Sequence, residues 1–192
     1  MDAASAYEQH AHNFLRGRNR SSIGAGIIRQ WAHTLPRGAE VIEIACGGGY
    51  PVTTELVDAG VKLWAIDSSP TLVSEFHARF AEIPIRCEKV QDSDFFERTF
   101  DGVIAVGLLF LLPEFEQAEV ISRVANILVP GGRFLFMAPI EGGTWRDMNT
   151  GIKCVSLGRK RYEDILEESG LRILATRVDR GKNNYYETEK LS

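Results

Sequence analysis

Three consecutive glycines, Gly47 to Gly49, directly follow an apolar segment that contains one acid, Glu43. A second acid, Asp67, ends the next apolar segment, 18 residues after Gly49. Glycines at the end of a strand let the backbone approach a ligand closely, and a carboxylate can accept hydrogen bonds from two neighbouring hydroxyl groups. A close-approach loop followed by an acid that can hold a sugar diol favours a nucleotide-like ligand.

The spacing of the glycines argues against two common nucleotide sites. Counted from Gly47, the dinucleotide pattern G-x-G-x-x-G finds Gly49 at its third place but Val52 at its sixth. A phosphate-binding P-loop needs Gly-Lys followed by Ser or Thr, and the sequence has no such triplet. The P-loop class is therefore excluded. A nicotinamide oxidoreductase is kept as a third alternative. The missing third glycine and the small carboxy-terminal half of the chain argue against it.

Strands that alternate with helices are predicted to position these residues. Apolar periodicity indicates two helices before the first strand, and then an α/β alternation that is typical of a parallel sheet covered on both faces. Pro51 and the pair Ser69-Pro70 predict the starts of two helices. The predicted strands cover 39–45, 61–67, 84–90, part of 100–112, 133–139 and two segments within 171–191, whereas 140–157 is expected to be irregular.

Composition narrows the class of protein. With 192 residues, of which 44% are hydrophobic and 25% charged, the chain is expected to form one domain, 1–192, with its own core. The net charge of −4 predicts no nucleic-acid or membrane partner. The longest apolar run, 103–112, is half of a membrane span, and no secretory signal is visible, so a cytoplasmic protein is expected. Cys46, Cys87 and Cys154 lack metal-ligand spacing, and no metal site is predicted.

The segment Glu43-Ile44-Ala45-Cys46-Gly47-Gly48-Gly49 resembles the first motif, acid-x-Gly-x-Gly-x-Gly, of class I S-adenosylmethionine-dependent methyltransferases. Ala45 replaces the first glycine, where a small residue with negative φ is expected to serve. The resemblance extends over about 38–139 and includes "AIDSSP", "VQDSDFF", "FDGVIAVG" and "LVPGGRFLF" in the family's order. It implies a Rossmann-like, doubly wound fold with a mostly parallel seven-stranded sheet, an antiparallel last strand and helices on both faces.

The resemblance also implies S-adenosylmethionine as the cofactor. In the family's pattern Asp67 meets the ribose, Asp92 with Ser93 meets the adenine, and Asp94 is the rival for that role. Glu43 has two interpretations: a strand acid satisfied by backbone donors, or a residue that stiffens the glycine loop and reaches the methionine amino group. The implied cofactor-binding residues are Glu43, Ala45, Cys46, Gly47, Gly49, Asp67, Ser68, Asp92, Ser93, Val106, Gly107 and Arg18, of which Arg18 binds the carboxylate or faces solvent.

The acceptor pocket is expected between the amino-terminal helices, 1–36, and the segments that follow the fourth and fifth strands. Trp145, Arg146 and Asp147 are unusual residues for a mere connection, and an aromatic and acidic wall suits a cationic or ring-shaped acceptor. Two adjacent tyrosines on a strand point to opposite faces, so at most one of them faces a pocket. The candidate pocket residues are Tyr7, Phe14, Phe110, Trp145, Tyr185 and Tyr186, and no catalytic base is assigned.

Two hypotheses about function follow from these observations. The first is methyl transfer from S-adenosylmethionine to a small-molecule acceptor at N, O or S, because the chain is close to the bare catalytic fold. The alternative is a non-catalytic S-adenosylmethionine-binding protein that acts through a partner. The protein is expected to be a monomer or a homodimer.

Overall fold

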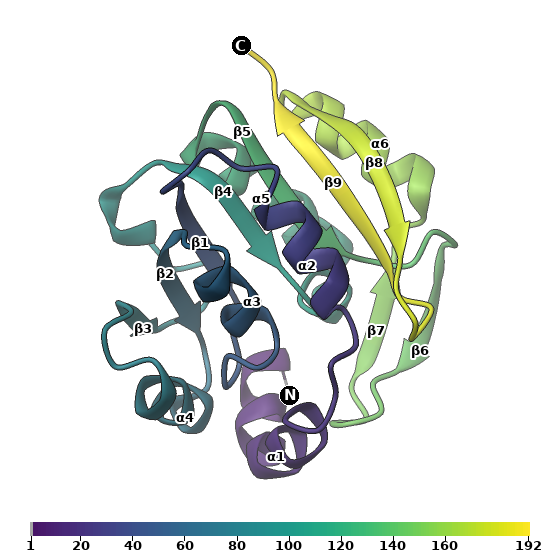
Figure 1. Ribbon diagram of the computed structural model, residues 1–192. Coiled ribbons are helices and arrows are strands. Elements are labelled where there is room, and N and C mark those ends of the chain that lie inside the picture. Colours follow the sequence, from purple (N-terminus) through teal and green to yellow (C-terminus); the bar gives the residue numbers. More distant parts are fainter. Residues whose placement is uncertain (1) are drawn as a thin grey trace.

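The computed structural model describes residues 2–192, so residue 1 of the predicted segments 1–192 and 1–36 lies outside the described residues. Its centre is a seven-stranded sheet in the order β3-β2-β1-β4-β5-β9-β8 (Figure 1). The strands β1 to β5 pair in parallel, and β9 is antiparallel to both of its neighbours. The predicted α/β fold with an antiparallel last strand is confirmed. The sheet strands are β1 (Glu40–Ile44), β2 (Lys62–Asp67), β3 (Ile85–Cys87), β4 (Phe100–Ala105), β5 (Leu128–Met137), β8 (Leu171–Val178) and β9 (Asn184–Lys190).

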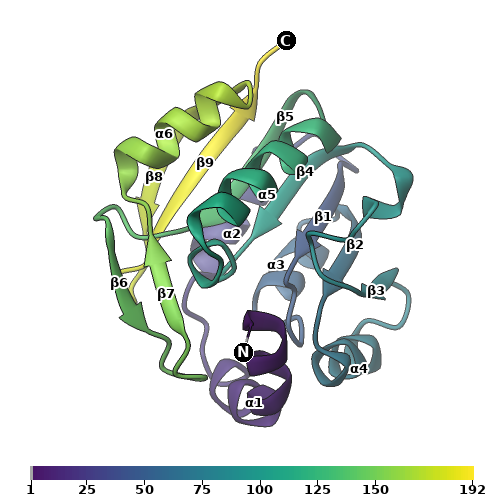
Figure 2. The same cartoon turned by 180° about the vertical axis from the view of Figure 1, so that it is seen from behind.

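Helices cover both faces of the sheet, as Figures 1 and 2 show from opposite sides. One face carries α2 (Ala25–Ala32), α3 (Val52–Asp58) and α4 (Pro70–Arg79), and the other carries α5 (Glu114–Ile127) and α6 (Arg159–Glu168). Alternation along β1 divides the core between the faces, because Val41 belongs to the cluster beneath α2 and α3, whereas Ile42 and Ile44 belong to the cluster beneath α5 and α6.

The predicted helix starts differ in accuracy. Ser69 caps α4 by accepting a hydrogen bond from the Leu72 N–H, with Pro70 as the first helical residue, so that prediction is confirmed. Pro51 immediately precedes α3 rather than opening it. The residue before α2 is Gly24, whose φ is +90° and where a Cβ would lie 2.5 Å from the Tyr185 hydroxyl, so glycine suits this position.

The stretch 140–157 is not irregular, which corrects the sequence-based expectation. It contains an antiparallel hairpin of β6 (Gly143–Arg146) and β7 (Lys153–Ser156), with Trp145 opposite Cys154. The turn is closed by the Asp147 N–H donating to the Ile152 carbonyl at 2.9 Å. Each strand has only four residues, which is too few for period-two alternation to stand out in the sequence. Short 3₁₀ turns, η1 (Phe95–Glu97) and η2 (Leu109–Leu111), complete the chain.

The first helix, α1 (Ala3–Arg18), lies beyond the carboxyl ends of β1, β2 and β4, between α4 and the β6–β7 hairpin (Figures 1 and 2). Glu8 attaches α1 to the start of α4, because its carboxylate accepts hydrogen bonds from the Thr71 hydroxyl at 2.7 Å and from the Ser69 hydroxyl. Tyr7 reaches the hairpin turn on the other side. Within residues 2–192, no helix combines the length and apolar character needed to cross a membrane.

Candidate functional site

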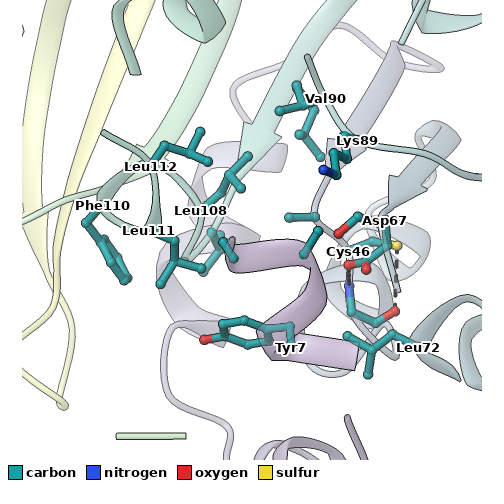
Figure 3. Close-up of a pocket in the computed structure, with 18 of the residues that line it drawn as sticks. Tyr7, Cys46, Asp67, Leu72, Lys89, Val90, Leu108, Phe110, Leu111 and Leu112 are labelled. Atoms are coloured by element: carbon teal, nitrogen blue, oxygen red, sulfur yellow. Dashed lines mark hydrogen bonds between the residues drawn. The ribbon is translucent and has the colours of Figure 1, made fainter. Parts of the chain in front are cut away.

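A cavity of about 800 Å³ lies at the carboxyl ends of the parallel strands, beneath α1. Ligands of open α/β sheets bind at this edge, in the crevice that forms where the strand order reverses, here between β1 and β4. Figure 3 shows Asp67 and Cys46 at one end of the cavity and Phe110 and Leu111 at the other, with Tyr7 projecting from α1 across the gap. The fold thus brings the glycine loop and the aromatic residues to one cavity.

The glycine loop leaves β1 with a backbone that glycine permits. Gly47 has φ +58° and Gly49 has φ +86°. The Gly47 N–H donates a 2.8 Å hydrogen bond to the Asp67 carboxylate, which connects the loop to the end of β2. Gly49 does not line the cavity; a Cβ there would lie 2.5 Å from Phe80 Cε2. Gly49 was expected among the cofactor-binding residues, but in the structure it packs against Phe80 at the end of α4.

Ala45 corrects the expectation of a negative φ at the first position of the motif. Its φ is +57°, in the left-handed region where an L-residue with a Cβ is strained. The chain therefore follows the same left-handed course that a glycine would take, and it does so at the cost of local strain. Ala45, Cys46 and Gly47 all line the cavity.

Asp67 is buried at the floor of the cavity, with 7% of its surface exposed. Besides the Gly47 N–H it accepts the Ser69 N–H at 2.9 Å. Burial raises the pKa of Asp67, and the backbone donors of Ser69, Gly47 and Ser68 oppose that rise. Because each carboxylate oxygen has two lone pairs, Asp67 retains capacity to accept hydrogen bonds from a ligand.

Glu43 is 2% exposed and lines the same end of the cavity. Its partner is the Thr53 hydroxyl on α3, which donates at 2.6 Å to Oε2. The expectation that loop N–H groups satisfy Glu43 is wrong, because the Gly47 N–H points to Asp67 instead. Burial raises the pKa of Glu43 to about 8, with the Asp67 charge adding to the rise and Arg18 opposing it.

Arg18 also lines the cavity, near Glu43, at the end of α1. Its guanidinium donates to the Ile23 carbonyl at 3.2 Å. Burial lowers the pKa of Arg18, whereas the Tyr185 and Glu43 groups raise it. Arg18 offers a positive charge to this part of the cavity, and Glu43 offers a negative charge once it is ionised.

The predicted adenine residues separate in the structure. Asp92 lines the cavity, but Ser93 does not: its hydroxyl donates to the Glu88 carboxylate and accepts from the Phe95 N–H. The rival Asp94 caps η1 and pairs with Arg86 away from the cavity. The sequence analysis missed neighbours of Asp92, because a loop carries no periodic signal. They are Glu88, Lys89, Val90 and Gln91, with Lys89 bound to Asp2 at 2.6 Å.

Val106 and Gly107, at the end of β4, line the middle of the cavity, and Ser68 lines it beside Asp67. Within residues 2–192, no group of three or more His, Cys, Asp or Glu side chains is arranged to hold a metal ion. The cavity combines a loop, several carboxylates and aromatic rings.

The two neighbouring tyrosines of β9 point in opposite directions, as alternation predicts. Tyr185 lines the cavity and donates to the Asp179 carboxylate at 2.9 Å. Tyr186 lies in the core on the other face, where its ring stacks on Phe136 with centroids 4.8 Å apart. Tyr186 is therefore a core residue rather than a pocket residue.

Tyr7, Phe14 and Phe110 line the cavity, with the Phe14 ring close to Gly47, but Trp145 does not line it. Trp145 is 37% exposed and packs on the outer side of Phe110, with ring centroids 5.4 Å apart. Asp147, which the sequence had singled out beside Trp145, does line the cavity. The hairpin also contributes residues that the sequence did not single out, because their approach to α1 depends on how the hairpin folds. These are Asn149, Ile152 and Lys153, joined by Leu108, Leu111 and Met137 from other segments.

Residues 41–132 match the family described as methyltransferase domain. The matched region begins in β1 and runs to the glycines early in β5, so it contains the glycine loop, Asp67 and the end of β4. The same motifs lie together around the cavity. This chain contains a class I S-adenosylmethionine-dependent methyltransferase domain.

Relatives of this methyltransferase domain differ in the acceptors that their names give. A ubiquinone biosynthesis O-methyltransferase of Xanthomonas axonopodis pv. citri is 29% identical over 115 residues, which are 57% of this chain and 46% of that protein. A tRNA U34 carboxymethyltransferase of Idiomarina loihiensis is 22% identical over 128 residues, covering 59% of this chain and 38% of that protein. The chain spans about half or less of the length of these relatives.

Solved structures share the fold of the methyltransferase domain over nearly its whole length. An S-adenosylmethionine-dependent methyltransferase from Clostridium acetobutylicum has a TM-score of 0.73 at 15% identity, covering 97% of this chain and 99% of that one. A 1,6-didemethyltoxoflavin-N1-methyltransferase from Burkholderia thailandensis has a TM-score of 0.72 at 16% identity, covering 100% and 92%. These identities support the common architecture rather than a common acceptor.

Proposed function

We propose that this protein transfers a methyl group from S-adenosylmethionine to a small-molecule acceptor. The observation that carries the proposal is the continuity of the cavity, which holds Glu43 and Asp67 at the glycine-loop end and Tyr7 and Phe110 at the other. Methyl transfer needs both reactants in line and close together, and one cavity with two chemically different ends meets that requirement.

The glycine-loop end fits S-adenosylmethionine through the chemistry of its side chains. The buried Glu43 carboxylate has the Thr53 hydroxyl as its side-chain partner and suits the methionine amino group. Arg18 suits the methionine carboxylate, and Asp67 has the capacity to accept the ribose hydroxyls. Asp92 and the apolar Val90 provide a polar and an apolar contact for the adenine. Ser93 is outside this proposed set because its hydroxyl is turned toward Glu88.

The cofactor supplies an electrophilic methyl group: as the new bond to the acceptor forms, the carbon–sulfur bond breaks and its electron pair stays on sulfur. The task of the chain is to hold the acceptor in line and to exclude water. We assign the covering role to the amino-terminal helices, because α1 lies across the strand ends and contributes Tyr7, Phe14 and Arg18 to the cavity wall.

Two features favour a small molecule over a nucleic acid. A volume of about 800 Å³ lies within the range of small-molecule sites, and side chains of α1 form part of the cavity wall. The net charge of −4 gives no general attraction for phosphates. The ubiquinone and toxoflavin names of two similar proteins agree with this class of acceptor, whereas the tRNA name of another does not.

Calorimetric titration with S-adenosylhomocysteine tests the cofactor half of the proposal. We expect binding in the micromolar range by the wild-type protein and a loss of about a hundredfold in Asp67→Ala. The exposed Asp58→Ala, at the end of α3, is the matched control and should bind like the wild type. No binding by the wild type at millimolar ligand would overturn the proposal.

Transfer from methyl-labelled S-adenosylmethionine tests the other half. A panel of small amines, thiols and alcohols should include at least one compound that becomes labelled in the presence of the wild-type protein. Labelling of bulk tRNA but of no small molecule would contradict the assigned acceptor class.

A further inference from the structure

We propose that the far end of the cavity binds an acceptor that carries a protonated amine, and that Asp147 and Tyr7 are the groups that recognise it. This inference rests on the proposed function and names the chemical class of its acceptor. Tyr7 comes from α1 and Asp147 from the β6–β7 turn, 140 positions apart in the sequence. Both line the cavity.

Asp147 is held rigidly by its own turn. Its Oδ2 atom accepts hydrogen bonds from the Thr150 N–H at 2.8 Å and from the Thr150 hydroxyl at 2.7 Å. Its backbone closes the turn in both directions, with the Gly151 N–H donating to the Asp147 carbonyl at 2.8 Å. One carboxylate oxygen is thus committed to the turn, and the other, Oδ1, is directed toward Tyr7 and the cavity.

The Tyr7 hydroxyl faces Asp147 Oδ1 at 3.5 Å, the outer limit of a hydrogen bond. Because the carboxylate only accepts, the phenol must donate its hydrogen to Asp147 and keep its oxygen lone pairs for other partners. Burial and the Asp147 charge raise the pKa of Tyr7 well above its ordinary value, so the phenol stays protonated. Tyr7 and Asp147 therefore present hydrogen-bond acceptors and negative charge to a ligand, and a ligand with N–H donors and positive charge complements them.

The surrounding walls suit the same ligand. The Phe110 and Tyr7 rings and the Leu111 and Ile152 side chains line this end, and aromatic faces attract cations and stack on rings. Figure 3 shows the Tyr7 ring extending from α1 toward the side of Phe110 and Leu111. Lys153, a cation that also lines the cavity, is exposed, so water screens its charge. An aromatic or alicyclic amine thus matches both the charge and the apolar wall.

Three probes of similar size separate this proposal from simple hydrophobic binding: 2-phenylethylamine, 2-phenylethanol and phenylacetate. Each is titrated by calorimetry into protein saturated with S-adenosylhomocysteine. We expect the amine to bind about tenfold more tightly than the alcohol or the acid, because a charge-assisted hydrogen bond replaces a neutral one or a repulsion. Equal binding of the three probes, or no binding of the amine at about 10 mM, overturns the proposal.

Two variants assign the effect to the named residues. Asp147→Asn keeps an oxygen for the Thr150 donors and should weaken amine binding about tenfold while the affinity for S-adenosylhomocysteine is unchanged. Tyr7→Phe keeps the ring, removes only the hydroxyl and should weaken amine binding severalfold. Because Tyr7 lies on α1, this variant tests the site without altering the hairpin turn. The matched control is Asp164→Asn, whose carboxylate pairs with Lys160 on the surface of α6. Wild-type amine binding in both site variants overturns the assignment.

The outcomes also distinguish this inference from the proposed function. If S-adenosylhomocysteine binds and the amine shows no preference, only the acceptor class is overturned. If S-adenosylhomocysteine does not bind to the wild-type protein, the proposed function fails, and this inference fails with it.

Discussion

The Gly47 N–H and the Asp67 carboxylate are joined by a 2.8 Å hydrogen bond, so the glycine loop after β1 is fastened to the end of β2. The same carboxylate also accepts from the Ser69 N–H at the start of α4. Asp67 therefore holds the loop in place before any ligand arrives. Such preorganisation reduces the entropy that a ligand must otherwise overcome on binding.

Asp67→Asn is expected to loosen this connection with little change in volume. The amide can present only one acceptor oxygen, so either the Gly47 or the Ser69 N–H faces an NH₂ group instead of an oxygen. We expect hydrogen exchange of the Gly47 or the Ser69 amide to accelerate about tenfold and the affinity for S-adenosylhomocysteine to fall about tenfold or more. Exchange of both amides that stays at the wild-type rate, measured by NMR, would refute a preorganising role.

Glu43 is expected to make the stability of the ligand-free protein depend on pH. Its pKa is about 8 when folded and near 4.5 when unfolded, so between these values the folded state binds more protons. The free energy of unfolding should therefore fall as pH rises through this window, by at most about 1.4 kcal/mol per pH unit for this group. Urea unfolding at a series of pH values from 5 to 8 measures the slope.

The Glu43→Gln variant isolates this contribution, because glutamine keeps an acceptor for the Thr53 hydroxyl and does not titrate. The pH slope of the wild type should exceed that of the variant in this window. If the two slopes coincide, Glu43 is not the titrating group. In the proposed site, S-adenosylhomocysteine should also bind the wild type more tightly at pH 8 than at pH 6, because the ionised carboxylate attracts the ligand's ammonium group.

Ala45→Gly is expected to stabilise the protein. Ala45 has φ +57°, and removing its Cβ relieves strain of about 1–2 kcal/mol, part of which is offset by the larger entropy of glycine in the unfolded chain. The net gain should be up to about 1 kcal/mol, measured by urea unfolding with unchanged denaturant dependence. A destabilised variant would show that the Cβ makes contacts that outweigh the strain.

Gly49→Ala and Gly60→Ala form a matched pair, because both glycines have positive φ, +86° and +77°. A Cβ at Gly60 meets no atom within 4 Å, whereas one at Gly49 would clash with Phe80. We expect Gly60→Ala to cost about 1 kcal/mol through strain alone and Gly49→Ala to cost at least about 1 kcal/mol more through overpacking. Thermal or urea unfolding of both proteins measures the difference, and equal losses would exclude the packing role of Gly49.

Local pattern was enough to predict the frame of this protein. Short apolar segments, which became strands such as Glu40–Ile44 and Lys62–Asp67, alternate along the sequence with segments of helical periodicity. The helix cap at Ser69-Pro70 is also a signal between neighbouring residues. The glycine loop and Asp67 could be paired in advance, because consecutive parallel strands place their carboxyl ends at one edge of the sheet. Because side chains alternate along a strand, Tyr185 and Tyr186 had to point to opposite faces of the sheet. The sequence did not decide which of the two lines the cavity.

The other end of the site was decided only by tertiary structure. Tyr7 and Asp147 meet because α1 docks on α4 through Glu8 while an inconspicuous hairpin folds toward it from the opposite side. Trp145 was the residue of that hairpin that the sequence made most conspicuous. In the structure Trp145 packs on Phe110 outside the cavity, and Asp147 lines the cavity instead. Ser93 likewise does not line the cavity, because its hydroxyl donates a hydrogen bond to Glu88. Contacts between distant segments depend on the summed packing of the whole chain, and no local spacing encodes them.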